Sequence, residues 1–470
     1  MLIFSRVFKT VFFTCLSIQS VFANNYSNKK NYYLEKVSQV LPESSLSTFL
    51  YKYSNGLTLI VVPQTKNSFS TLFTVVNAGS NKEIEKKDAG IAHFLEHLFF
   101  LDAKGSKNKK FEQELLKLGA EFNAHTYKRF VRFYINFPAP AFDEILKLQG
   151  NMFQNLEINS TSLENERNIV LNEKSISVDK DDIFSKTSET LNKILYHKTP
   201  YEESILGSEE NIKSFTAKQL YDFYSQHYSP KNTIFIVVGK FNPDNIAEKI
   251  YQEFKNWKAK SENPEKKYSH NLNFSNYICF DKNLPTNRFT FVFKKEKFSE
   301  EDIIYFDILN YILTNKSNSF VSELYEKDYI SDFYLYYNTG SGVIDDETEF
   351  NFETSDPKNF STHKNALFNK LNEIKNTKFT FYELNKMRDY LIKNSALNYE
   401  KSFNIAENIA FNFFTFKTTN PEVKLSEIIS NLNNSNFSNW IEENFIKNKY
   451  YTKKFLQDKK LINFCKIDER

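Results

Sequence analysis

The sequence has few cysteines, no excess of charge and no long apolar run. Three cysteines occur in 470 residues, and their spacing does not resemble a cysteine-based metal site. Basic and acidic residues nearly balance, at 61 against 58. Because no basic arm or stripe is present, we do not expect nucleic acid as a partner. Glycine is also scarce, with 10 residues beside many Lys and Asn, a bias that says little about function.

The first 23 residues have the pattern of a secretory signal peptide. Arg6 and Lys9 give a positive start, Val11–Ile18 is mostly apolar, and a small residue, Ala23, precedes the predicted cut. An uncleaved membrane anchor is the alternative, but a span needs about 20 apolar residues and polar side chains interrupt this stretch. Lipid attachment at Cys15 fits the flanking residues poorly. We therefore predict cleavage after Ala23 and export to the periplasm.

Two cysteines, Cys279 and Cys465, remain after the predicted cut. In an oxidising compartment they could form a disulfide, and they could equally be two unrelated buried thiols. Without Arg6 and Lys9, 59 basic residues face 58 acidic ones, a net charge of +1. The exported chain is thus expected to be almost neutral.

The pattern along the chain predicts two α+β halves. A hairpin is expected at 49–63 around the turn pair Asn55-Gly56, and a strand followed by a helix over 71–101 recurs in the same order at 288–313. Each half should be an α/β sandwich, an antiparallel-rich sheet packed with helices. The predicted organisation is a signal peptide at 1–23, a polar lead-in at 24–45, an N-terminal domain at 46–257, a linker at 258–274 and a divergent C-terminal domain at 275–470.

A metal-binding pattern lies in the helix predicted over 89–101. His93 and His97 are four residues apart, so their rings share one helix face and can reach one Zn²⁺ at ~2.0–2.1 Å. Glu96 borders the same face and is placed to hold a zinc-bound water, whose proton a carboxylate can pass to a leaving amine. The alternative is a surface pair of histidines, which the largely apolar neighbours of this helix disfavour.

A catalytic zinc needs a third protein ligand and one open position. The helix predicted over 162–178 offers Glu166 and Glu173, which are seven residues apart and share a face. A solvated face with Glu–Arg pairing is the alternative. The residues alone leave both interpretations open.

Several segments resemble the insulinase/pitrilysin family (M16), above all its two-domain branch, which includes the mitochondrial processing peptidase. The resemblance rests on Ser54-Asn55-Gly56-Leu57-Thr58, Ala78-Gly79-Ser80-Asn81, Gly90-Ile91-Ala92-His93-Phe94-Leu95-Glu96-His97-Leu98-Phe99-Phe100 and Glu166-Arg167-Asn168-Ile169-Val170-Leu171-Asn172-Glu173. It implies an M16 peptidase-like fold whose N-terminal domain is the catalytic zinc domain. His93, His97 and Glu173 would be the zinc ligands, Glu96 the general base and Glu166 a supporting catalytic carboxylate.

The same resemblance implies how substrate and partner are held. Residues 119–126 resemble an edge strand to which the substrate backbone adds, with Asn123 and Ala124 binding substrate. Arg129 and Val131 stand where the family often has Asp and Thr. Tyr325 and Asp332 stand where many members carry an Arg and a Tyr that contact substrate. Because catalytic subunits of two-chain members also lack that pair, the resemblance implies a heterodimer with an Arg/Tyr-bearing M16-like subunit. A homodimer is the alternative.

The expected function is that of a periplasmic zinc metalloendopeptidase acting on short or unfolded peptides, with one Zn²⁺ per chain. A non-catalytic scaffold or chaperone-like member is one alternative, which the intact His93, Glu96, His97 and Glu173 disfavour. A zinc-storing protein is another, but it would have no need of Glu96.

Overall fold

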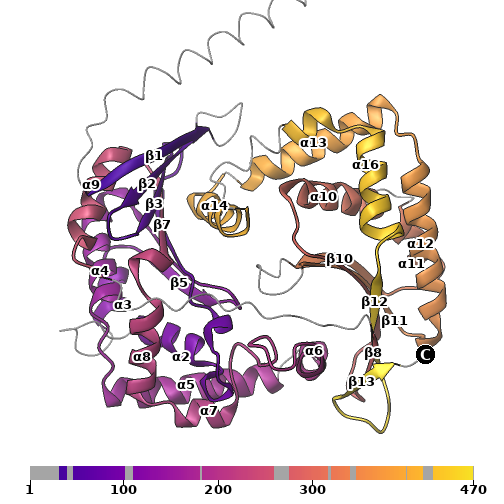
Figure 1. Ribbon diagram of the computed structural model, residues 1–470, viewed down its shortest axis with the longest axis horizontal. Coiled ribbons are helices and arrows are strands. Elements are labelled where there is room, and N and C mark those ends of the chain that lie inside the picture. Colours follow the sequence, from indigo (N-terminus) through magenta and orange to yellow (C-terminus); the bar gives the residue numbers. More distant parts are fainter. Residues whose placement is uncertain are drawn as a thin grey trace, which may run out of the picture.

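The computed structural model describes residues 31–39, 46–100, 110–179, 183–258, 275–315, 319–338, 346–398, 400–416 and 427–468. The chain forms two halves that face each other, each with a sheet on its inner side and helices outside (Figure 1). The predicted signal peptide and residues 259–274 of the predicted linker lie outside the described residues. Among the described helices, none is long and apolar enough to cross a membrane.

The first half contains a seven-stranded sheet in the order β1-β2-β3-β7-β4-β6-β5. The second half contains a six-stranded sheet in the order β10-β11-β9-β12-β8-β13. The strands are β1 (Tyr32–Gln39), β2 (Ser47–Tyr53), β3 (Thr58–Pro63), β4 (Phe69–Val76), β5 (Glu121–Thr126), β6 (Val131–Pro138), β7 (Thr233–Gly239), β8 (Asn276–Phe280), β9 (Asn287–Lys295), β10 (Asp332–Asn338), β11 (Asp346–Thr354), β12 (Tyr450–Leu456) and β13 (Phe464–Asp468).

The two sheets repeat one topology. The order β3-β7-β4-β6-β5 in the first corresponds strand by strand to β8-β12-β9-β11-β10 in the second. In each sheet the corresponding pair, β3 with β7 and β8 with β12, is parallel, while the other pairs are antiparallel. The predicted α+β fold with two related sandwich halves is therefore confirmed.

Most of the helices lie between corresponding strands of the two halves. Those of the first half are α2 (Ile91–Phe99), α3 (Lys110–Lys117), α4 (Phe142–Gln154), α5 (Ser160–Asp179), α6 (Ile183–Leu195), α7 (Glu209–Ser214), α8 (Ala217–His227) and α9 (Pro243–Phe254). Those of the second are α10 (Glu300–Thr314), α11 (Phe320–Glu326), α12 (Phe360–Asn376), α13 (Phe381–Asn398), α14 (Ser402–Phe416) and α16 (Asn434–Ile441).

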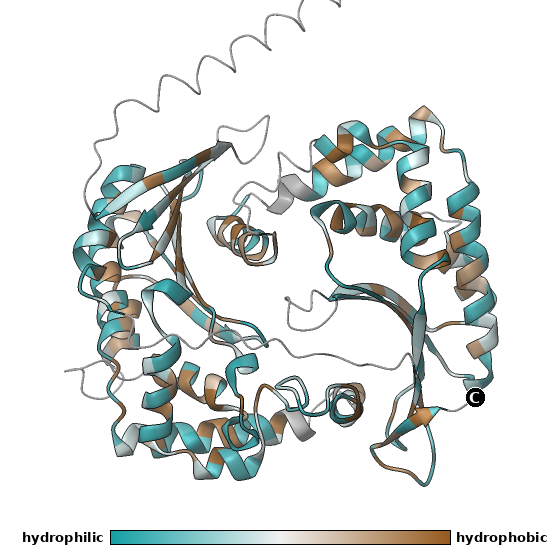
Figure 2. Cartoon of the chain, viewed as in Figure 1, coloured by the Kyte–Doolittle hydropathy of each residue, from teal (hydrophilic) through white to brown (hydrophobic). Residues whose placement is uncertain are grey.

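Each half places one helix on the inner face of the other half's sheet. Helix α14 of the second half buries Ile405 and Ile409 against Ile236 and Val75 of the first sheet, and its apolar side is visible in Figure 2. Helix α6 of the first half packs in the same way against the second sheet through Leu191. Because β7 is apolar on both faces, burying it requires a helix on each side.

The prediction of a loose polar lead-in at 24–45 is wrong for residues 32–39, which form strand β1 at the sheet edge. The ring of Tyr32 packs against Tyr51, Tyr53 and Tyr251, and its hydroxyl donates to Glu248. Pairing with β2 and this aromatic cluster outweigh the polar composition that suggested a loop.

Cys279 and Cys465 form a disulfide, which decides between the two predicted alternatives. The two residues lie opposite each other on β8 and β13. The bond joins the last described strand to the strand that opens the second half.

Candidate metal centre

Helix α2 carries both histidines, and its start is fixed by two close contacts. Gly90 has φ +97°, and a Cβ there would lie 2.8 Å from Gly207 Cα, so only glycine fits. Gly90 has no side chain that could cap the N-terminus of the helix. Instead, the Ala92 N–H donates to the buried Glu83 carboxylate at 3.0 Å. Burial raises the pKa of Glu83 to about 8, and the backbone hydrogen bonds from Ala92 and Gly90 oppose this rise.

Three donor atoms converge beside α2. The Nε2 atom of His93 lies 3.6 Å from Glu173 Oε2, and the Nε2 atom of His97 lies 3.2 Å from the same oxygen. The centroids of the two imidazole rings are 4.8 Å apart. The structure therefore brings together the three residues that the family resemblance implied as zinc ligands, with ligand atoms within 4.8 Å of one another.

These donors fit a zinc ion. A tetrahedral site with Zn–N of ~2.0–2.1 Å places ligand atoms roughly 3.3–3.4 Å apart, close to the two distances observed. Two imidazoles and one carboxylate are a donor set used by catalytic zinc. Glu173 is 44% exposed while the side chain of His93 is 10% exposed, so one side of the site is open.

Helix α5 contributes two carboxylates to the two edges of one imidazole. Glu166 Oε2 lies 3.2 Å from His97 Nδ1, while Glu173 lies beside the Nε2 atom of the same ring. Arg167 fixes the helix by donating to the carbonyls of Ile212 and Phe215. Glu166 is thus placed to orient His97 rather than to join the three converging donors.

The charges of the site differ strongly between its two histidines. Burial, with the nearby His97, lowers the pKa of His93 to about 4, which keeps its imidazole neutral. Burial would also lower the pKa of His97, but hydrogen bonds with Glu166 and Glu173 outweigh it and raise the pKa to about 9. The hydrogen bond from His97 lowers the pKa of Glu173. The carboxylates therefore favour positive charge at the point where the donors converge.

Glu96 lies beside the donors and is bonded to strand β5. Its Oε2 accepts a hydrogen bond of 2.6 Å from the Thr126 hydroxyl. Burial raises the pKa of Glu96, and the Thr126 bond opposes this rise. A raised pKa makes the carboxylate a better acceptor for a proton from a nearby water.

Strand β5 borders the same cavity, which has a volume of about 700 Å³. It is the last strand of its sheet and pairs with β6, and no described strand pairs with its other edge, which could accept a further strand. Asn123 and Ala124, predicted to bind substrate, both line the cavity. The side chain of Asn123 accepts a hydrogen bond of 2.8 Å from the Ala124 N–H.

The residues that depart from the family pattern lie elsewhere. Tyr325 of α11 donates to Asp332, the first residue of β10, at 3.3 Å, and both side chains are exposed. Neither lines the cavity beside the histidines. Val131 is buried in β6, whereas Arg129 lines a second cavity, between the halves.

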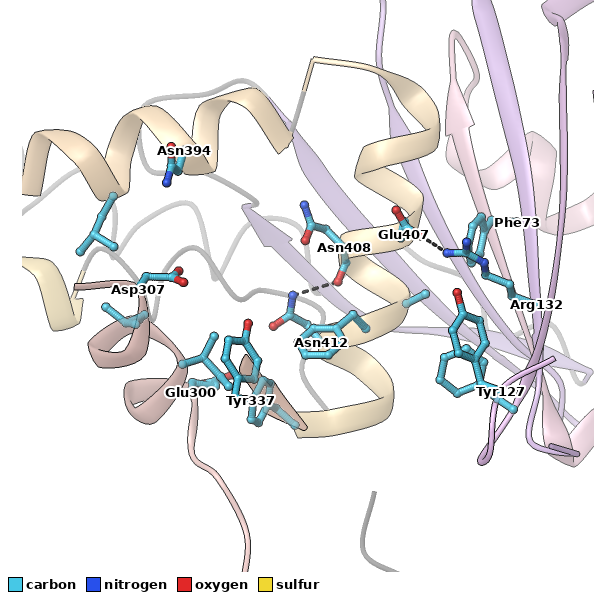
Figure 3. A pocket seen from close by; sticks show the side chains of 17 residues that line it. Phe73, Tyr127, Arg132, Glu300, Asp307, Tyr337, Asn394, Glu407, Asn408 and Asn412 are labelled. Carbon is cyan, nitrogen blue, oxygen red and sulfur yellow. Dashed lines mark hydrogen bonds and ion pairs between the residues drawn. The ribbon is translucent and has the colours of Figure 1, made fainter. Parts of the chain in front are cut away.

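At the corresponding position of the second half, a cavity between the two halves has no metal-binding group among its described lining residues (Figure 3). Helices α10 and α13 and strand β10 stand where α2, α5 and β5 stand in the first half, and they contribute Asp307, Asn394 and Tyr337 to a cavity of about 460 Å³. Its lining includes no histidine. On the side of the cavity next to the first sheet, Arg132 of β6 forms an ion pair with Glu407 of α14. Among the described residues, the His93, His97 and Glu173 group is the one that could hold a metal ion.

Two residues of the site were missed from the sequence. Thr126 lies within the segment that suggested the edge strand, yet its bond to Glu96 depends on how β5 meets α2. Glu83 supports α2 from nine residues before Ala92, whereas a capping signal in the sequence is sought within about three residues of the helix start. Neither contact has a local sequence signal.

Comparison with known proteins agrees with this arrangement. Residues 59–209 match the family Insulinase (Peptidase family M16), and residues 214–391 match the Peptidase M16 inactive domain. Zinc protease PqqE of Helicobacter pylori is 26% identical over 361 residues, which cover 75% of this chain and 80% of that protein. Mitochondrial-processing peptidase subunit beta of Dictyostelium discoideum is 26% identical over 221 residues, 47% of this chain and 45% of that protein.

The alignment therefore spans a little under half the length of the mitochondrial relative. Among solved structures, the first half of the periplasmic protease PqqL from Escherichia coli superposes with a TM-score of 0.71 at 16% identity, covering 90% of this chain and 94% of that one. Both family domains occur here in order, and the histidine motif lies in the first. The chain belongs to the M16 (insulinase) family of peptidases.

Proposed function

We propose that the chain is a zinc-dependent endopeptidase that cleaves short or unfolded peptides. The observation that carries the proposal is the convergence of His93 Nε2, His97 Nε2 and Glu173 Oε2 beside a buried Glu96 and an open strand edge. Zinc, when bound by these three residues, supplies Lewis-acid polarisation and makes a water molecule more acidic.

The side chains of the protein divide the remaining work. Glu96 takes a proton from the attacking water and delivers it to the leaving amine as the C–N bond breaks. Thr126 holds the Glu96 carboxylate, and Glu166 holds His97 in the orientation that points Nε2 at Glu173. Strand β5 pairs with the substrate backbone, which selects extended chains with little demand on side chains.

The test is a comparison of the wild-type chain with Glu96→Gln. The amide keeps the shape of the carboxylate but cannot accept the proton, so peptide hydrolysis should fall by roughly 10²–10⁴-fold while zinc content and the unfolding midpoint stay unchanged. In a companion variant, Thr126→Val, the rate of peptide hydrolysis should fall less, because this change removes only the hydrogen bond to Glu96. Near-normal turnover in Glu96→Gln would refute this role. A wild-type chain that binds zinc and cleaves no peptide would favour the scaffold alternative.

We place the mature protein in the periplasm. The signal-like residues before Ala23 support this, and so does the likeness in fold to PqqL, a periplasmic protease. Mass spectrometry of the periplasmic fraction should find a chain that begins at Asn24. Detection of the uncleaved chain in the membrane fraction would contradict the proposal.

We also propose that a second chain completes the site. Tyr325 and Asp332 stand where the resemblance leads us to expect an Arg and a Tyr, and they form a hydrogen bond with each other. The cavity beside the histidines is also open on the Glu173 side. A heterodimer with an M16-like subunit that carries the Arg and Tyr is expected, and a homodimer is the alternative. Size-exclusion chromatography with activity measurements distinguishes them. Efficient cleavage by the isolated monomer would refute both.

A further inference from the structure

A second cavity begins where strand β5 ends. Its volume is about 540 Å³, and it lies between the first half and the inner face of the second sheet. Thr126, the last residue of β5, lines the cavity beside the histidines, and the next residues, 127–130, line the second cavity. Ile205 lines both. A peptide paired with β5 and extended beyond Thr126 would therefore enter the second cavity after a few residues, at about 3.3 Å per residue.

The turn that borders this cavity is held in place by backbone hydrogen bonds. Gly79, Ser80 and Asn81 donate from three successive N–H groups to the carbonyls of Arg129, Tyr127 and Lys128, at 3.1, 3.1 and 2.6 Å. A Cβ on Gly79 would lie 2.3 Å from the Tyr127 carbonyl oxygen, so this close approach requires glycine. The side chains of the turn thus start from a fixed backbone.

Arg129 brings a positive charge to the cavity without a balancing acid. Its Nη1 donates to the carbonyl of Phe414 at 3.2 Å, and its guanidinium lies 6.0 Å from the Phe414 ring. Its Nε is buried and has no hydrogen-bond partner. No described carboxylate forms an ion pair with it. A planar guanidinium with free donors matches the two oxygens of a carboxylate.

The opposite wall contributes a second donor. Asn351 is 2% exposed, and its Oδ1 accepts from the Thr290 hydroxyl at 2.7 Å, whereas its Nδ2 has no partner. It belongs to a row across four adjacent strands that lines the cavity, Tyr334, Asn351, Thr290 and Lys453. A buried amide N–H without an acceptor is costly, so a ligand oxygen at this position would be stabilising.

The acids on this wall are already neutralised by neighbouring bases. Glu349 accepts from Lys453 at 2.7 Å, and Glu347 lies 3.5 Å from Lys294. Arg288, which also lines the cavity, forms two hydrogen bonds with Glu353. The unmatched groups of the described wall, Arg129 and the Asn351 amide, are donors, so the cavity favours an acceptor with negative charge.

We infer that this cavity binds a carboxylate of the peptide substrate, a few residues beyond the segment paired with β5. Arg129 is then a specificity-determining residue that selects peptides with Asp or Glu, or a chain end, at that distance. The inference rests on the proposed peptidase function, because the substrate strand on β5 delivers the carboxylate to Arg129.

The test measures binding rather than turnover, so that it does not depend on catalysis. In the Glu96→Gln background, labelled ten-residue peptides with one Glu at successive positions are compared with twins that carry Gln. At one or two positions the Glu peptide should bind roughly 10-fold tighter or more, the value of a charge-assisted bond over a neutral one. Adding Arg129→Gln should abolish the difference, and adding Arg129→Glu should transfer the preference to a Lys peptide.

Arg132→Gln is the matched control. It removes the same charge from the adjoining strand β6, but from an arginine already paired with Glu407, so the Glu preference should persist. Equal binding of Glu and Gln peptides at every position would overturn the inference. An equal loss of the Glu preference in Arg129→Gln and Arg132→Gln would also overturn it, because it would mean that the overall electrostatic potential, and not Arg129, attracts the carboxylate. If the preference is present while the wild-type chain cleaves no peptide, the proposed function fails and the binding site stands.

Discussion

Substituting the two carboxylates of α5 should separate the zinc ligand from the residue that supports it. Glu173 Oε2 faces both Nε2 atoms, at 3.6 and 3.2 Å, whereas Glu166 faces only the far edge of His97, at 3.2 Å. Glu173→Gln replaces a charged ligand with a weak neutral one and should leave the purified chain without zinc. Glu166→Gln keeps all three ligands and should weaken zinc binding without abolishing it.

The size of the Glu166 effect follows from its hydrogen bond. Its side chain is 6% exposed, so water screens the contact with His97 little. A charge-assisted bond contributes about 1.5–3 kcal/mol and a neutral one about 0.5–1.5 kcal/mol. The difference, about 1–2 kcal/mol, weakens zinc binding by roughly 5- to 30-fold, which overlaps the roughly 10- to 100-fold found when such supporting partners of metal ligands are changed.

The assay is competition with a zinc-binding dye, together with metal content after dialysis against a chelator. Glu164→Gln is the control, because Glu164 lies on the same helix, is 63% exposed and bonds to Arg167 instead of the histidines. Its zinc affinity should match the wild type. Wild-type affinity in Glu173→Gln would refute the ligand assignment. Equal loss in Glu166→Gln and Glu173→Gln would show that Glu166 is itself a ligand.

Two further predictions concern stability. Burial, helped by Lys82, lowers the pKa of His227 to about 4, from about 6.5 when unfolded. Above pH 6.5 the neutral imidazole makes its full contribution to stability, and up to about 3 kcal/mol of the free energy of unfolding is lost as the pH falls toward 4. Urea unfolding at a series of pH values should therefore show a smaller change of the free energy of unfolding with pH in His227→Gln than in the wild type. An equal change with pH in both would contradict this. Ile409→Ala should lower the free energy of unfolding by about 2–5 kcal/mol, because Ile409 is fully buried between α14 and the first sheet; an unchanged urea midpoint would mean that this contact does not hold the halves together.

Elements defined by local signals were predictable from the sequence. The hairpin of β2 and β3 forms around Asn55-Gly56, and Gly56 has the positive φ, +93°, that the turn requires. Helical periodicity over 142–154 predicts a helix there, and α4 has those bounds in the structure. In both cases the periodicity or turn chemistry of a few neighbouring residues determines the conformation.

Long-range contacts could not be predicted in this way. The sequence of α14 has apolar residues at helical spacing, but nothing in that spacing indicates that the sheet it covers lies more than 150 residues earlier in the chain. Strand β1 was missed because its partners, β2 and Tyr251, supply the burial that its own composition lacks. The disulfide was left open for the same reason, since the register of β13 on β8 decides it.

The site shows the same division between local and tertiary information. His93, Glu96 and His97 are ordered by one helical turn, so their shared face follows from spacing alone. Glu173 joins them through the packing of α5 against α2, and Arg167 ties α5 to the C-terminal part of α7. Glu83 and Thr126 act through contacts that no short motif encodes. The resemblance to the M16 family supplied the Glu173 assignment, which spacing had left undecided.

The two halves repeat one topology, but among the described residues only the first half carries a metal-binding set at the corresponding position. The positions of α2 and α5 correspond to α10 and α13, yet the second-half cavity offers Asp307 and Asn394 in place of a metal-binding set. That half is free to use the inner face of its sheet differently. The inner face of the first sheet is apolar and covered by α14, whereas the second presents Glu347, Glu349, Asn351 and Glu353 at alternate positions of β11. Each of these three acids is paired with a base of the same sheet, whereas the Nδ2 atom of Asn351 has no partner. Because a buried amide N–H without an acceptor is costly, we interpret this part of the second sheet as a wall that faces the substrate carboxylate proposed to bind Arg129 of the first half.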